Sequence, residues 1–363
     1  MLTANKGEWS EIYTLLKIIS DKNLYAGDSG LNKIENLVFP IIKILRDESK
    51  GTYQYSYESD LVIIKGNEEE FRIPISQFQE KAILLLSKLK ESTNATFSIP
   101  EIENFMQSFN CLSIKAKSSV KSDIRIVIHD QRTGTTPELG FSIKSQLGGA
   151  STLLNAGKTT NFVYKVSGDF QKADIDTINS LVVRRGKKVN ADLKGRTKAI
   201  LKKGDLQFIT CSNKTFLNNL TLIDSSLPQI IADVLIKFNS ENNSTLAELI
   251  KETAIDNPLK FDMSGNHNFY HYKIRRFLTD IALGMMPSKV WSGQLDATGG
   301  YLIVKKDGDI LCYHIYNRNE FEDYLLANTK LETASSTRHD FGTIYSENKE
   351  LFFKLNLQIR FLK

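Results

Sequence analysis

Apolar residues recur at helical spacing in several parts of this sequence. In residues 7–19 they place Trp9, Ile12 and Leu16 on one face of an amphipathic helix. Residues 37–47 and 77–90 are also rich in apolar positions and predict two further helices. Helices are expected as well over residues 227–239, 245–254, 269–286 and 320–327.

Other segments are rich in β-branched residues and predict strands. Residues 123–130 and 139–145 are separated by Gly, Thr and Pro and predict an antiparallel hairpin. A second hairpin is expected at residues 61–75, with a solvated acidic turn at its tip, and a third at residues 301–316 around an Asp-Gly turn. Residues 181–204 are expected to form helix and loops, and residues 351–361 one terminal strand.

Composition excludes several classes of protein. The chain is 41% hydrophobic and 25% charged, as globular proteins are. No apolar run approaches the roughly 20 residues of a membrane span, so no membrane partner is expected. Cys111, Cys211 and Cys312 lie far apart, which argues against a disulfide framework or a zinc site and favours a reducing cytoplasm. Residues 1–9 show no apolar secretory signal region.

Positive charge is concentrated in one stretch of the chain. The net charge is +5, but residues 181–204 alone hold nine Lys or Arg and one acid, Asp192. Such local concentration indicates a polyanionic partner. The stretch contributes the following candidate DNA contacts: Arg184, Arg185, Lys187, Lys188 and Arg196.

The hairpin at residues 123–145 carries the candidate chemistry. Asp123 begins one strand, and Ser142 and Lys144 share a face of its antiparallel neighbour. A strand carboxylate can hold Mg²⁺ beside a phosphate, and a lysine ammonium can orient water and offset developing charge. This pattern is typical of metal-dependent phosphodiester cleavage. A serine and a lysine also share a strand by chance in many proteins, and Asp123 alone can be an ordinary strand-start residue.

One metal ligand is missing from this pattern. The usual motif has an acid two residues before the lysine, where this chain has Ser142. Residues 145–168 contain no Asp or Glu, so an acid from the following helix is excluded. Four acids remain open as the missing ligand or an additional catalytic group: Glu8, Glu11, Asp130 and Glu138. Glu8 also has a structural interpretation, as a first-turn carboxylate favoured by the helix dipole.

Further basic positions are candidates for DNA contact. Residues 155–160 lack the spacing of a Walker loop, but Lys158 suits a phosphate contact. Three basic pairs can read guanine edges or contact phosphates. They are Arg184 with Arg185, Arg275 with Arg276, and Arg338 with His339.

Several motifs in order along the chain resemble the HpaII-like type II restriction endonucleases. They are residues 6–11 (KGEWSE), 139–145 (LGFSIKS), 155–162 (NAGKTTNF), 336–339 (STRH) with Phe341 and Gly342, and 355–361 (LNLQIRF). The resemblance covers nearly the whole chain. It implies a Mg²⁺-dependent, sequence-specific endonuclease of a bacterial restriction–modification system. The type member cuts double-stranded 5′-CCGG between the cytosines, leaves 5′ overhangs and is blocked by methylation.

The resemblance also implies a PD-(D/E)xK-type core, an α/β fold with a mixed sheet flanked by helices and with extra helical and β-hairpin recognition elements. Lys144 carries over as the motif lysine and Asp123 as the motif acid. Ser122 replaces the usual Pro, and Ser142 the second acid. Three regions, which can pack as one body, are expected: 1–105 with N-terminal helices and a hairpin, 106–225 with the nuclease core, and 226–363 for recognition.

We therefore expect a type II restriction endonuclease that produces 5′-phosphate and 3′-hydroxyl ends. Double-stranded DNA is the expected partner, and a palindromic target favours a homodimer. A cognate methyltransferase is expected as a genetic partner, not as a binding partner. Two alternatives remain: a DNA-binding protein without catalysis, and a strand-nicking repair endonuclease.

Overall fold

The strands expected at residues 123–130 and 139–145 form the centre of a nine-stranded mixed sheet in the computed structural model. They are β6 (Ile124–Ile128) and β7 (Glu138–Ser145), and they pair antiparallel. The structure describes residues 2–115, 122–131, 133–186, 188–295 and 298–363. The hairpin predicted from the sequence is confirmed.

The strand order of this sheet is β1-β14-β13-β7-β6-β2-β3-β4-β5. β13 runs parallel to β7, and β14 runs parallel to β1, whereas the other neighbours are antiparallel. β1 also pairs with β2, so six strands form a closed circuit of pairings. The remaining bounds are β1 (Asn23–Gly27), β2 (Lys33–Glu48), β3 (Gly51–Glu58), β4 (Leu61–Gly66), β5 (Glu69–Pro74), β13 (Gly300–Val304) and β14 (Ile310–His314).

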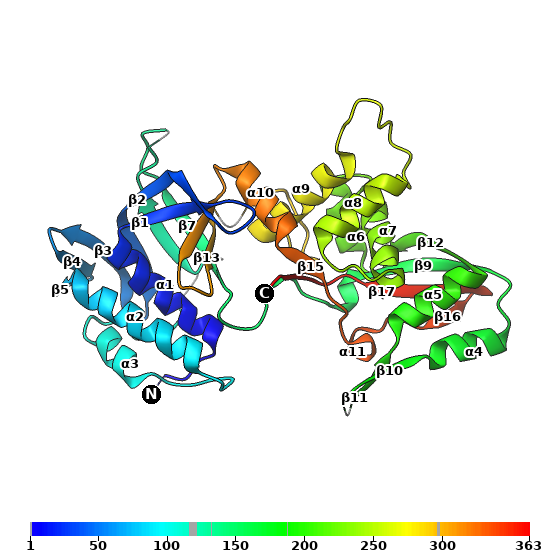
Figure 1. Ribbon diagram of the computed structural model, residues 1–363, viewed down its shortest axis with the longest axis horizontal. Helices are drawn as coiled ribbons and strands as arrows, with labels where there is room; N and C mark the ends of the chain where they lie inside the picture. The colour runs from blue at the N-terminus through cyan, green and yellow to red at the C-terminus, as the bar shows by residue number, and fades with distance from the viewer. Residues whose placement is uncertain (1, 116–121, 132, 187, 296–297) are drawn as a thin grey trace. The chain divides into compact units, whose positions relative to one another are not determined.

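Helices accompany this sheet on the side seen in Figure 1. They are α1 (Lys6–Asp21), α2 (Ile75–Glu91) and α3 (Pro100–Gln107). The apolar face predicted for residues 7–19 is fully buried, with Trp9, Ile12 and Leu16 each 0% exposed. α1 packs against α2 and β7. The predicted amphipathic helix is thus confirmed, and its apolar face fixes it to the core.

The helix predicted at residues 37–47 is wrong, because this segment is part of the long strand β2. Leu37, Phe39 and Ile41 are buried at alternate positions, which is the period of a strand. Pro40 lies in the middle of the segment and disfavours a helix interior. The first part of β2 pairs with β1 and the second part with β6 and β3, so both edges of the strand are used.

A second group of elements is built around three smaller sheets. The four-stranded sheet has the order β12 (Gly204–Cys211), β9 (Asn161–Gly168), β17 (Glu350–Asn356) and β16 (Ile344–Glu347). The three-stranded sheet consists of β15 (Thr329–Leu331), β18 (Ile359–Phe361) and β8 (Thr152–Leu154). The two-stranded sheet consists of β10 (Val182–Arg185) and β11 (Lys188–Ala191). All their pairings are antiparallel.

Helices pack around these sheets, except that α10 (Arg318–Ala327) contacts the nine-stranded sheet through Phe321 and Tyr324. The four helices predicted beyond residue 226 are confirmed, the third of them ending at Leu283. The bounds are α4 (Lys172–Ser180), α5 (Leu193–Lys203), α6 (Lys214–Ile223), α7 (Leu227–Ser240), α8 (Leu246–Asp256), α9 (Phe269–Leu283), α10 (Arg318–Ala327), α11 (Ser336–His339) and the 3₁₀ turn η1 (Lys158–Thr160). None of the described helices is both long and apolar enough to cross a bilayer.

Two further sequence expectations need correction. Residues 181–204 contain the β10–β11 hairpin before helix α5, because Val182, Val183 and Val189 favour strands. Residues 351–361 form two strands in different sheets, β17 and β18, rather than one.

The chain divides into two compact units. The first comprises residues 1–151, 295–324 and 363, and the second comprises residues 152–294 and 325–362. The nine-stranded sheet belongs to the first unit, and the three smaller sheets belong to the second. Both units draw on more than one of the three regions expected from the sequence.

Candidate active site

The carboxylate of Asp123 lies across from the strand that carries Lys144. Asp123 directly precedes β6, and one step beyond the last β6–β7 pair the register places it opposite Ser142. Its main-chain N–H donates to the carbonyl of Phe141 at 2.8 Å. Its Oδ2 accepts a hydrogen bond from the N–H of Ile143 at 2.7 Å. These bonds fix the acid against the lysine strand, as the spacing predicted.

Lys144 lies two residues after Ser142 and on the same face of β7. Its Nζ is 5.1 Å from the ring centroid of Tyr301. Burial lowers the pKa of Lys144, and the negative charges of Asp123 and Glu11 act in the opposite direction. A half-buried ammonium therefore lies near an aromatic ring and two carboxylates, which favour its charged form.

Glu11 is the helix carboxylate coupled to this group. Burial raises the pKa of Glu11 to about 7, and the charge of Asp123 adds to the increase. The positive charges of Arg46 and Lys115 oppose it. Two carboxylates that repel each other in a half-buried site favour a bound cation, because the cation offsets their repulsion.

Glu8 serves mainly to begin α1. Its Oε2 accepts from the N–H of Asn5 at 2.9 Å, and the Oδ1 of Asn5 accepts from the N–H of Glu8 at 3.1 Å. This capping box satisfies donors at the helix start. The other carboxylate oxygen of Glu8 lies 2.8 Å from Nζ of Lys115, and this hydrogen bond lowers the pKa of Glu8. The structure thus favours Glu11 over Glu8 as the helix acid of the site.

A side-chain hydrogen bond joins α1 to β7 beside the candidate site. Oγ of Ser10 donates to Oγ of Ser145 at 2.8 Å. Ser10 precedes Glu11, and Ser145 follows Lys144. This bond therefore fixes the spacing between the helix acid and the strand lysine.

The other two candidate acids lie elsewhere on the hairpin. Glu138 begins β7, six residues before Lys144, which corresponds to about 20 Å along a strand. It forms an ion pair with Arg125 at 2.7 Å. Asp130 follows the opposite end of β6 and is buried, where its charge acts on His314. The structure does not bring either acid to Lys144.

The donors at this site suit a divalent cation with few protein ligands. Among the residues that the structure describes, no group of three or more His, Cys, Asp or Glu side chains is arranged to hold a metal ion. Asp123 and Glu11 supply two carboxylates, and Mg²⁺ in proteins is usually bound through one or two carboxylates and keeps several waters. The pair therefore fits Mg²⁺ better than structural zinc, which takes four protein ligands.

Three residues near this group carry no sequence signal that singled them out. Tyr301 on β13 lies opposite Ser142 of β7, and burial together with the charge of Asp123 raises the pKa of Tyr301. Arg46 and Lys115 act on Glu11 through their charges. Only the pairing of strands far apart in the chain brings Tyr301 to the site, so no local motif can indicate it.

Two of the segments that the sequence singles out lie together in the second unit. Nδ2 of Asn161 donates to the carbonyl of His339 at 2.8 Å and to that of Asp340 at 3.1 Å. Lys158 precedes Asn161 by three residues, and Arg338 directly precedes His339. Both cations are exposed. These hydrogen bonds hold together two segments that each present a cation to solvent.

Arg196 does not lie at the surface, contrary to the expectation of a DNA contact. The residue is only 5% exposed. Its guanidinium donates to the carbonyl of Leu181 at 3.0 Å, to that of Gly342 at 2.7 Å, and to that of Asn179. The role of Arg196 is therefore structural, because its donors are used inside the fold.

The remaining candidate DNA contacts lie on the β10–β11 hairpin and on α9. Arg184 of β10 is exposed. Arg185 belongs to β10 and Lys188 to β11, while Lys187 lies outside the described residues. On α9, both arginines of the predicted pair interact with neighbours. Arg276 lies 3.6 Å from a carboxylate oxygen of Asp280, and burial together with the charge of Arg275 lowers the pKa of His271.

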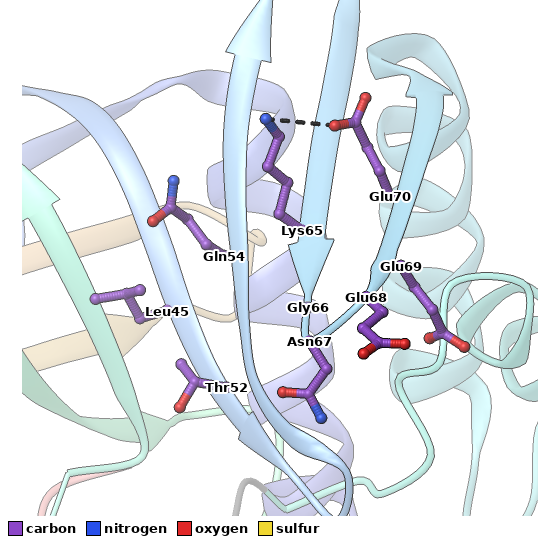
Figure 2. A pocket seen from close by; sticks show the side chains of 9 residues that line it. All are labelled: Leu45, Thr52, Gln54, Lys65, Gly66, Asn67, Glu68, Glu69 and Glu70. Carbon is purple, nitrogen blue, oxygen red and sulfur yellow. Dashed lines mark ion pairs between the residues drawn. The ribbon is translucent and has the colours of Figure 1, made fainter.

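A hollow of about 580 Å³ lies over the β3–β4–β5 part of the first unit (Figure 2). The acidic turn between β4 and β5 forms part of its lining. The antiparallel pairing of these two strands confirms the turn that the sequence predicted. Figure 2 shows the ion pair between Lys65 and Glu70, at 3.3 Å. None of the candidate site residues lines this hollow. Its lining consists of Leu45, Thr52, Gln54, Lys65, Gly66, Asn67, Glu68, Glu69 and Glu70.

Comparison with known proteins adds independent information. The family model described as HpaII restriction endonuclease matches residues 5–361. The chain is 50% identical over 366 aligned positions to the Type II restriction enzyme HpaII of Haemophilus parainfluenzae, and the alignment covers 99% of each protein. No solved structure matches this chain.

Proposed function

Because the chain belongs to the HpaII restriction endonuclease family, we propose that it cleaves double-stranded DNA at 5′-CCGG with Mg²⁺ as its cofactor. As a member of this family it is a type II restriction endonuclease, a site-specific deoxyribonuclease that binds double-stranded DNA. The target is the one that the family resemblance implies. The observation that carries the catalytic part is the group formed by Glu11, Asp123 and Lys144.

The first unit is the nuclease core in this proposal. Its mixed sheet with flanking helices is consistent with a PD-(D/E)xK-type fold, with Asp123 at the start of β6 and Lys144 on the neighbouring strand β7. Ser142 occupies the position of the usual second acid. Glu11 takes the place of that acid, because its carboxylate is coupled to Asp123 from α1.

Each side chain has a separate task in hydrolysis. Asp123 and Glu11 hold the cation, which when bound offsets charge on the scissile phosphate. The ammonium of Lys144 orients the attacking water and stabilises the negative charge that develops on the phosphate oxygens. Ser142 lies beside Lys144 on the same strand face and orients a water molecule. Water adds to phosphorus as the bond to the 3′ oxygen breaks, which leaves a 5′-phosphate and a 3′-hydroxyl.

Exposed cations of the second unit contact the DNA in this proposal. Lys158 and Arg338 are presented by segments that Asn161 ties together. They suit phosphate contacts, which set the position of the protein on the duplex. A homodimer, a cytoplasmic location and a methyltransferase that protects the same sequence in the host complete the proposal.

Digestion of a plasmid of known sequence, with Mg²⁺ or with EDTA, tests this function. We expect discrete Mg²⁺-dependent fragments whose sequenced ends lie at CCGG. Discrete fragments with ends at another sequence would support the nuclease activity but reject the proposed target sequence. A gel shift on the same DNA without any cleavage would favour a protein that only binds, and accumulation of nicked circles would favour a strand-nicking enzyme.

Substitution of the motif lysine tests the site itself. Lys144→Ala should abolish cleavage, because it removes the ammonium that lies on the strand next to Asp123 and orients the water. DNA binding should remain largely intact, since Lys144 is one charge among many on the protein. Cleavage at the wild-type rate by Lys144→Ala would show that the site is assigned wrongly.

A further inference from the structure

The β10–β11 hairpin projects from the rest of the second unit (Figure 1). Its register pairs Arg184 with Val189, and Val182 with Ala191. Directly opposite residues of an antiparallel pair point to the same face, and so do residues two apart on one strand. One face of the hairpin therefore carries a single guanidinium among small apolar side chains.

The apolar side chains of this hairpin are exposed to solvent. Val182 is 53% exposed, and Val189 is 60% exposed. Val183, on the opposite face, is 37% exposed. A two-stranded hairpin is only marginally stable alone, and exposed apolar surface on it indicates a binding partner.

The base of the hairpin is held rigidly, although its faces are free. The main-chain N–H of Asp192 donates to the carbonyl of Leu181 at 3.0 Å, which closes the hairpin. The buried guanidinium of Arg196 binds the same carbonyl and also that of Asn179. The side chain of Asn179 in turn exchanges two hydrogen bonds with the main chain of Ile344, at 2.8 and 2.9 Å. A pinned base fixes the direction in which strands β10 and β11 leave the rest of the second unit.

Charge identifies the partner. Residues 181–204 hold nine Lys or Arg and one acid, and that acid, Asp192, is used to cap α5. Arg184, in contrast, is exposed to solvent. An exposed arginine on a basic ribbon complements the polyanionic groove of DNA, whose major groove is wide enough for a two-stranded ribbon.

We propose that the β10–β11 hairpin enters the major groove of the target and that Arg184 contacts a guanine there. This inference rests on the proposed function. The planar guanidinium can donate two hydrogen bonds to O6 and N7 of guanine, which is the commonest specific contact in that groove. Val182 and Val189 flank the guanidinium and pack on the cytosine C5–H edges. They exclude water from those hydrogen bonds.

Binding measurements without cleavage test this contact. Wild-type protein and Arg184→Lys are titrated, in EDTA, with a duplex containing CCGG and with one lacking it. Lysine keeps the charge but loses the bidentate fork. We expect the affinity for the CCGG duplex to fall roughly 10- to 100-fold and the affinity for the other duplex to stay within about 2-fold. The dependence of binding on salt should be unchanged, because the number of phosphate contacts is unchanged.

A matched control separates base reading from general charge. Lys198 is exposed on α5 in the same basic stretch. Lys198→Ala should weaken binding to both duplexes by the same factor. If Arg184→Lys behaves like Lys198→Ala, or changes neither affinity, Arg184 reads no base and the inference is overturned.

Base analogues locate the contact in the groove and need no protein variant. Replacing a target guanine with 7-deazaguanine removes N7, whereas inosine removes only the minor-groove amino group. We expect 7-deazaguanine to weaken wild-type binding and to have little further effect on Arg184→Lys. Sensitivity to inosine alone would place the hairpin in the minor groove and reject the proposal. A wild-type protein that neither cleaves nor discriminates any duplex would instead overturn the proposed function.

Discussion

Single residues with the same chemistry have different roles in this protein because their surroundings differ. Glu8 and Glu11 lie one turn apart on α1. Glu8 is held by the capping box and by Lys115, and these contacts lower its pKa. Burial and the charge of Asp123 raise the pKa of Glu11 to about 7. The two glutamates therefore form a matched pair for a test of the metal site.

Glu11→Gln should reduce Mg²⁺-dependent cleavage by about 100-fold or more, because it removes one of two anionic ligands. Glu8→Gln should leave cleavage within a few-fold of wild type, since glutamine can still form the capping box. The measurement is the initial rate of plasmid cleavage at several Mg²⁺ concentrations. If Glu8→Gln is the inactive variant and Glu11→Gln is active, the assignment of the helix acid is reversed.

His314 shows the effect of burial on a titratable group outside the candidate site. Its Nδ1 accepts from the N–H of Tyr316 at 2.9 Å, and its ring stacks on that of Phe39 at 5.5 Å. Burial lowers the pKa of His314 to about 4, although the charge of Asp130 acts in the opposite direction. The folded protein therefore keeps His314 neutral over a pH range in which the unfolded chain is protonated.

This difference predicts a loss of stability in acid. Between pH 6.5 and pH 4 this histidine binds a proton in the unfolded chain but not in the folded protein. The free energy of unfolding therefore decreases by about 2–3 kcal/mol as the pH is lowered from 6.5 to 4. His314→Asn keeps an acceptor for Tyr316 but does not titrate. Urea denaturation at pH 4, 5.5 and 7 should show a shallower pH dependence for this variant. Equal pH dependence for both proteins would contradict the prediction.

At the scale of elements, a few buried polar contacts decide how the functional segments are held. The hydrogen bond between Ser10 and Ser145 fixes α1 to β7 next to Glu11 and Lys144. In the second unit, Arg196 binds carbonyls of α4, of the start of the hairpin and of residue 342. Helix propensity and strand pairing form the elements, but these contacts set their spacing.

Arg196→Met should destabilise the protein by about 2–4 kcal/mol, because three buried carbonyls lose their donors. Methionine keeps an apolar stem of similar length, so lost packing contributes little. Chemical denaturation measures the change, with Lys198→Met on the same helix as an exposed control that should stay within about 0.5 kcal/mol of wild type. A stable Arg196→Met protein with weakened DNA binding would restore the interpretation of Arg196 as a surface contact.

At the scale of the whole molecule, the chain divides into a unit with the catalytic candidates and a unit with most of the basic ones. Glu11, Asp123 and Lys144 belong to the first unit, whereas Lys158 and Arg184 belong to the second. A palindromic target presents the same bases twice, and a two-fold dimer matches that symmetry.

We expect two copies of the chain on one site. Sedimentation with a CCGG duplex in EDTA should show twice the 41.1 kDa mass of the chain, besides the DNA. On a supercoiled plasmid with one site, linear DNA should form without accumulation of nicked circles, because each copy cuts one strand. A complex of one chain per site, with nicked circles as an intermediate, would indicate sequential cleavage by a monomer.

Local patterns were sufficient for much of the fold. The 3.6-residue spacing of Trp9, Ile12 and Leu16 predicted α1, and the turn residues between residues 128 and 138 predicted the β6–β7 hairpin. The prediction for residues 37–47 was wrong, because Leu37, Phe39 and Ile41 follow the two-residue period of a strand and Pro40 disfavours a helix interior. The β10–β11 hairpin was missed because its glycine and lysines masked the strand signal of the valines.

The sequence by itself determined the family, the position of Asp123 next to the strand that carries Lys144, and the basic character of residues 181–204, because each depends on short spacing or on composition. Only the tertiary structure gave Glu11 and Glu8 different surroundings, brought Tyr301 beside Lys144 and buried Arg196. Those three outcomes depend on the packing of segments far apart in the chain. Packing decides which side chains lose water and which charges they meet, and no local pattern carries that information.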